Sequence, residues 1–106
     1  MRGAWLAVAV SLLALGCRRS DSEIKAEFDA FVATHNECAA TEECVLAGAD
    51  CPLGCSAAVN VKHKVVVEKK AAELVDEYES WGRHCDYECV SGKAMCVEGR
   101  CAFVVD

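Results

Sequence analysis

The spacing of apolar residues after residue 19 predicts first an amphipathic helix. In residues 20–36, helical spacing places four apolar residues on one face: Ile24, Phe28, Phe31 and Val32. Ser20 followed three residues later by Glu23 forms a capping box, in which each side chain satisfies a backbone N–H group of the other residue. We therefore expect this helix to start near Ser20 and to cover the core with its apolar face.

A second helix is predicted over residues 61–80, with Asn60 as its N-cap and Gly82 after its end. The run of valines at 65–67 argues against it, because β-branched residues favour strands. The density of Lys, Glu and Ala that follows favours the helix. Its predicted apolar face consists of Val67, Ala71, Leu74, Val75, Tyr78 and Trp81.

Short segments between and after the helices predict strands. Residues 42–48 and 56–60 are expected to pair antiparallel, with the loop 49–55 held at both ends by cysteine. Residues 92–105 predict a hairpin that turns at Glu98-Gly99, which places Cys96 opposite Cys101 at a non-hydrogen-bonded pair. The predicted fold class is α+β: a small disulfide-rich domain with two helices packed on a small antiparallel sheet and a C-terminal β-hairpin.

The N-terminal residues 1–16 have a basic start and an uncharged apolar stretch of about the 7–15 residues found in signal peptides. This stretch is shorter than the about 20 residues of a membrane-spanning helix. Leu13 to Cys17 resembles the lipobox of bacterial lipoproteins, although Ala14 stands where leucine is usual. The resemblance implies cleavage before Cys17 and acylation of its sulfur and amine, which would anchor the chain to membrane lipid in the bacterial envelope, in the outer membrane or facing the periplasm.

This reading divides the chain into a signal peptide (1–16), a lipidated tether (17–21) and a disulfide-stabilised domain (22–106). Eight further cysteines remain once Cys17 is set aside, and an even count in an exported chain predicts four disulfides among the roughly 105 possible pairings. These are Cys38, Cys44, Cys51, Cys55, Cys85, Cys89, Cys96 and Cys101.

Two pairs of cysteines bracket the second predicted helix with the same spacing. Cys51 and Cys55 precede it, Cys85 and Cys89 follow it, and we expect disulfides to join the two brackets. Cys96 and Cys101 could bond to each other or to other elements. The order of these motifs from Cys38 to Cys101 resembles the eight-cysteine-cluster domain of small secreted proteins and lipoproteins of bacteria. That resemblance supports the fold and the exported location but transfers no activity.

The chain is acidic, with a formal net charge of −6. Loss of residues 1–16 removes Arg2 alone among the charged residues, leaving 10 basic against 17 acidic residues. Such a balance argues against a nucleic-acid partner, whose phosphates require clustered Lys and Arg. Arg18-Arg19 could touch anionic headgroups or belong to a solvated tether.

The residues that could carry chemistry form only weak patterns. Metal binding could use Cys51-x3-Cys55 or three histidines (His35, His63 and His84), but export favours oxidised cysteines. No Cys-x-x-Cys redox motif occurs. Four carboxylates on the second helix are expected to form a solvated face: Glu73, Asp76, Glu77 and Glu79. The loop 50–55 could act as a protease inhibitor with Leu53 as its anchor.

The sequence therefore predicts a non-catalytic, lipid-anchored domain without a cofactor, which has a binding or structural role toward an envelope protein. The alternatives are a periplasmic metal-binding or thiol-redox lipoprotein and a protease-inhibitor-like module.

Overall fold

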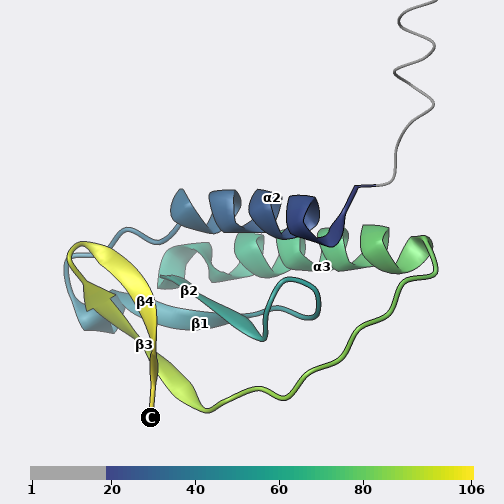
Figure 1. Ribbon diagram of the computed structural model, residues 1–106. Coiled ribbons are helices and arrows are strands. Elements are labelled where there is room, and N and C mark those ends of the chain that lie inside the picture. Colours follow the sequence, from purple (N-terminus) through teal and green to yellow (C-terminus); the bar gives the residue numbers. More distant parts are fainter. Residues whose placement is uncertain (1–18) are drawn as a thin grey trace, which may run out of the picture.

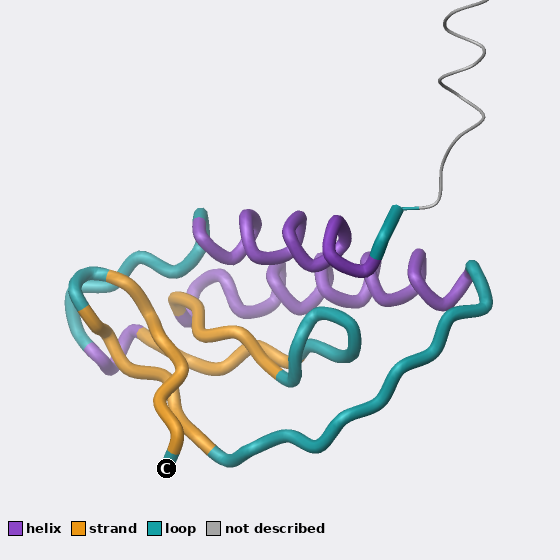
Figure 2. The backbone as a smooth tube through the Cα atoms, in the orientation of Figure 1, coloured by secondary structure: helices purple, strands orange, loops and turns teal. Residues whose placement is uncertain are grey.

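The computed structural model describes residues 19–106, so the predicted signal peptide (1–16) and the predicted lipidation site Cys17 lie outside the described residues. Two helices lie side by side, and four strands lie on the other side of the second helix (Figures 1 and 2). The elements in chain order are α2 (Asp21–Ala33), β1 (Cys44–Gly48), β2 (Ser56–Asn60), α3 (Lys64–Ser80), β3 (Gly92–Val97) and β4 (Arg100–Val105).

Helix α2 starts with the predicted capping box. The Ser20 hydroxyl accepts a hydrogen bond from the Glu23 N–H at 3.2 Å, and the Ser20 N–H donates to a Glu23 carboxylate oxygen at 3.0 Å. The helix ends at Ala33, three residues before the predicted end. There the N–H groups of Thr34 and His35 donate hydrogen bonds to the carbonyls three residues earlier, so the last turn is a tighter 3₁₀-type turn.

Helix α3 confirms the prediction of a helix through the valine run, but its first turn is a 3₁₀ turn (Val61–His63) and the α-helix starts at Lys64. The Asn60 side chain accepts from the Lys62 N–H at 3.1 Å, so the predicted cap closes this 3₁₀ turn. Val67 is fully buried whereas Val65 is 79% exposed. Burial on one helical face outweighs the strand preference of the valines.

The strands form two separate two-stranded antiparallel sheets, β1-β2 and β3-β4. Strand β1 starts at Cys44 and not at Glu42, because Thr41–Glu43 form a 3₁₀ turn. The hairpin turns at Glu98 and Gly99, both with positive φ, as a type I′ turn requires. Cys96 lies opposite Cys101 as predicted, and both of their N–H groups donate to residues outside the hairpin. The predicted mixture of helices and antiparallel strands is thus present.

Both helices and the β1-β2 sheet contribute to one hydrophobic core, where Phe28, Ile24, Val59 and Val67 are the largest fully buried side chains. A second, smaller cluster joins the two sheets. It consists of Cys44, Ala58 and Cys101, and the partly buried Cys38, Leu46, Ala94 and Cys96 pack against it.

Four disulfides fasten this arrangement. Cys51–Cys85 and Cys55–Cys89 join the two brackets around α3, which confirms the predicted link. Cys38–Cys96 and Cys44–Cys101 connect the C-terminal hairpin to the segment around β1, so the two hairpin cysteines bond to other elements and not to each other. The Cα–Cα distances, 5.5–5.9 Å, are ordinary for disulfides.

Candidate functional site

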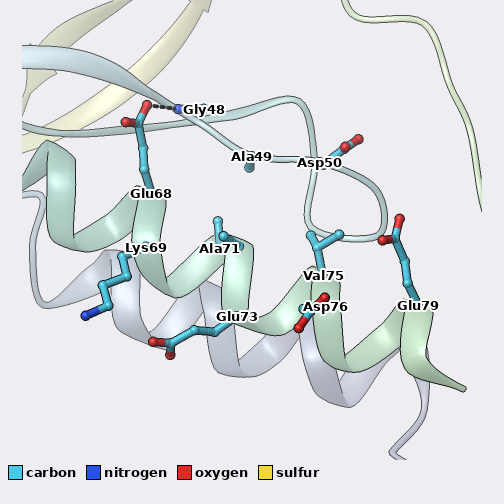
Figure 3. A pocket seen from close by; sticks show the side chains of 11 residues that line it. Gly48, Ala49, Asp50, Glu68, Lys69, Ala71, Glu73, Val75, Asp76 and Glu79 are labelled. Carbon is cyan, nitrogen blue, oxygen red and sulfur yellow. Dashed lines mark hydrogen bonds between the residues drawn. The ribbon is translucent and has the colours of Figure 1, made fainter.

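A groove lies between α3 and the segment that follows β1 (Figure 3). Its volume is about 590 Å³, within the size range of ligand pockets. The end of β1 is tied to α3 where the Gly48 N–H donates to a Glu68 carboxylate oxygen at 2.7 Å. The groove is lined by Gly48, Ala49, Asp50, Glu68, Lys69, Ala71, Ala72, Glu73, Val75, Asp76 and Glu79.

The floor of this groove consists of small hydrocarbon side chains, so it is apolar and leaves open space. Ala71 and Val75 point from α3 toward the 48–50 segment (Figure 3). Ala72, the next residue of the helix, also lines the groove. Carboxylates line one end and one flank of the groove. Glu79 rises beside Asp50 at one end, whereas Glu73 and Asp76 lie along the flank of α3 (Figure 3).

Three carboxylates of α3 that line the groove, here called the rim carboxylates, have no basic partner among the described residues. Glu73, Asp76 and Glu79 form no ion pair within residues 19–106. Glu77, which was predicted to belong to the same solvated face, instead receives two hydrogen bonds from Arg19, at 2.6 and 3.0 Å. The prediction of one common solvated face is therefore wrong for Glu77, because that side of α3 faces the start of α2.

Arg19 joins the N-terminal segment to both helices. It also bonds Glu27 of α2, which in turn pairs with Lys70 of α3 at 2.6 Å. The hydrogen bonds from Lys70 and then from Arg19 lower the pKa of Glu27. The hydrogen bonds that Arg19 donates to Glu77 and then to Glu27 raise the pKa of Arg19 above its usual range. Arg19 is thus held against the domain and is not a solvated tether residue.

The predicted metal ligands are distributed over separate places. The rings of His35 and His63 lie 4.9 Å apart between centroids, whereas His84 lies exposed on the connection after α3. The sulfurs of Cys38, Cys44 and Cys101 lie within 4.8 Å of one another, but each belongs to a disulfide. Sulfurs bonded in this way are not thiolates, and the thiolate is the form that binds metals.

The loop proposed as a protease-inhibitory segment has its anchor residue inside the molecule. Leu53 is 3% exposed and packs in the main core. Its N–H donates to the Asp50 carbonyl at 2.7 Å, and the neighbouring Gly54 N–H donates to the Tyr87 hydroxyl at 2.6 Å. The expectation that Leu53 anchors a protease is therefore wrong, because the loop folds back and buries this side chain in the main core.

Sequence reasoning missed the groove. The signals that could have indicated it are the small residues at 71 and 72 next to an acidic stretch without basic residues in the last turn of α3. Within residues 19–106, no helix has the length and apolar character that crossing a membrane requires. Comparisons with known protein families, curated proteins and solved structures found no match to this chain.

Proposed function

We propose that this protein is a lipid-anchored, non-catalytic binding domain of the bacterial cell envelope. The observation that carries the proposal is the use of the cysteines. All eight cysteines that follow Cys17 are paired with one another, so Cys17 alone has no disulfide partner among them. Four disulfides in a small domain suit an oxidising, exported location, and a single cysteine after an apolar leader suits acylation.

The position of Arg19 supports close attachment of the domain to a membrane. Arg19 contacts both helices, and it follows Cys17 by only two residues. Two residues span at most about 7 Å of extended chain. An acyl group on Cys17 would therefore hold the folded domain close to the bilayer surface, with the start of α2 and the end of α3 nearest to it.

A binding role is favoured over catalysis by the character of the groove. Its lining offers an apolar floor, carboxylates and one lysine, without a serine, threonine, cysteine or histidine for a nucleophile-and-base pair. Asp50 and the rim carboxylates are exposed to solvent, whereas catalytic carboxylates are usually tuned by burial. Ion pairs and the capping box shift the pKa values of Arg19, Glu23 and Glu27. These groups stabilise the fold and lie outside the groove.

The test is acylation of the full chain expressed in a bacterial host. We expect the wild type to partition into the detergent phase and to show the mass of a chain that starts at Cys17 with acyl groups attached. Cys17→Ser should remain uncleaved or soluble and unacylated. Ala14→Leu, which restores the usual lipobox residue, is the matched control and should be processed normally. Normal acylation of the Cys17→Ser variant would refute the anchor.

Thiol titration of the same protein separates this proposal from a metal-binding or thiol-redox lipoprotein. We expect four disulfides, no free thiol and no metal that co-purifies. Two or more reactive thiols, or a stoichiometric bound metal, would favour the alternative.

A further inference from the structure

We infer that the groove between α3 and the 48–50 segment docks a basic, amphipathic polypeptide segment, one in which Lys or Arg side chains flank an apolar side chain. The inference rests on the proposed binding function and names the chemistry of the partner. It follows from the shape of the groove, from the charges around it and from the way those charges are spaced.

The shape of the groove suits an inserted apolar side chain. Ala49, Ala71 and Val75 line the floor without filling it, and Ala72 is exposed beside them. The backbone of Gly48 forms part of the wall and is held in place by its bond to Glu68. A floor of small side chains fixed between a helix and a pinned strand end is largely preformed, which lowers the cost of ordering on binding.

The charges around the groove are unfavourable for the free protein. Glu73 and Asp76 are three residues apart on α3, as are Asp76 and Glu79, and like charges at that spacing destabilise a helix. Glu79 also lies in the last turn of α3, where the helix dipole disfavours a negative charge and no basic residue compensates it. No ion pair within residues 19–106 compensates these carboxylates, and a cationic partner would lower the repulsion between them.

The spacing of the carboxylates favours a partner with several positive charges over a single metal ion. Among residues 19–106, the only three potential metal-binding atoms that converge within 4.8 Å are cysteine sulfurs. The rim carboxylates and Asp50 are instead spread over two turns of α3 and the 48–50 segment, so one ion cannot contact three of them. Lys69 is the one basic residue of the lining, and it points away from the Asp50 end (Figure 3).

The test measures binding of a labelled short peptide of alternating leucine and arginine to the full chain in neutral detergent, by fluorescence anisotropy. The groove variant is Glu73→Gln with Asp76→Asn and Glu79→Gln. The matched variant is Glu37→Gln with Glu42→Gln and Asp86→Asn, which removes the same charge from exposed positions outside the groove. We expect the groove variant to lose about tenfold in affinity, as three rim contacts of modest strength imply, and the matched variant to change little.

A second pair of variants tests the floor. Ala72→Arg places a guanidinium in the groove and should abolish peptide binding, whereas Ala26→Arg makes the same change at an exposed position of α2 and should not. Circular dichroism should show all variants folded, and neutralising the rim should leave the melting temperature unchanged or slightly raised.

Several results would overturn the inference. Equal losses in the two charge variants would mean that net charge alone attracts the peptide. Equal binding of an arginine-only peptide would show that the apolar floor plays no role. Equal binding of a leucine-glutamate peptide would show the same for the rim carboxylates. Displacement of the peptide by low concentrations of calcium ions, at constant ionic strength, would identify a cation site instead. Intact mass of the same sample reports acylation, so failure of the anchor and failure of the groove are distinguishable.

Discussion

The two disulfides that bracket α3 should stabilise the fold redundantly, and this redundancy can be measured. Cys51–Cys85 and Cys55–Cys89 each close a loop with a sequence separation of 34. A single bridge of that separation would stabilise the folded state by about 3.8 kcal/mol through the entropy of the unfolded chain. The two bridges are not independent, however, because each lies only four residues from the other along the chain.

With one bridge in place, the second closes only a small ring made of residues 51–55 and 85–89. For about ten residues the same relation gives about 2.7 kcal/mol. Replacing Cys55 and Cys89 by alanine should therefore cost about 2.7 kcal/mol. If Cys51–Cys85 is then removed as well, the ring that it closes together with Cys44–Cys101 is lost. That ring contains about 25 residues, so this second step should cost about 3.5 kcal/mol.

The assay is urea unfolding of the purified protein, followed by circular dichroism, for the wild type, each single-bridge variant and the variant without both bridges. Cys55 and Cys89 are the cleaner pair to remove, because they are partly or fully exposed and little packing is lost. We expect the double loss to exceed the sum of the two single losses by about 1 kcal/mol. Strict additivity, with about 3.8 kcal/mol for each bridge, would refute the bracket as a coupled unit.

Two further predictions concern single residues. Leu53→Ala should lower the free energy of unfolding by about 3 kcal/mol, because it leaves a cavity in the main core. The control Leu46→Ala, at a half-buried position, should cost less. An unchanged stability for Leu53→Ala would mean that the loop is not packed inside. Glu27→Gln should cost about 0.5–1 kcal/mol at neutral pH. Since the folded state lowers the pKa of Glu27, this contribution is complete above the ordinary Glu pKa of about 4.3 and disappears as the pH falls through the lowered value. The stability difference between wild type and variant should therefore shrink in acid. A difference for Glu27→Gln that stays constant down to low pH would contradict the network around Arg19.

Local patterns in the sequence were sufficient where the stabilising contacts are only a few residues apart. The capping box at Ser20 and Glu23 and the turn at Glu98-Gly99 depend on hydrogen bonds and backbone angles within four residues. The helix ends were less accurate. A 3₁₀ turn before α3 and the tight turn after α2 depend on how the chain leaves the helix, and hydrophobic spacing carries no information on that.

The sequence by itself determined the helical faces and the hairpin, because periodicity and turn residues are properties of neighbouring positions. It also indicated the link between the two cysteine brackets, because both brackets have the same spacing and flank the same helix. Only the tertiary structure decided the partners of Cys96 and Cys101, the burial of Leu53, the docking of Arg19 against Glu77 and the presence of a groove beside α3. Each of these depends on residues from about twenty to almost sixty positions apart, which approach one another only when the helices and sheets pack around a common core.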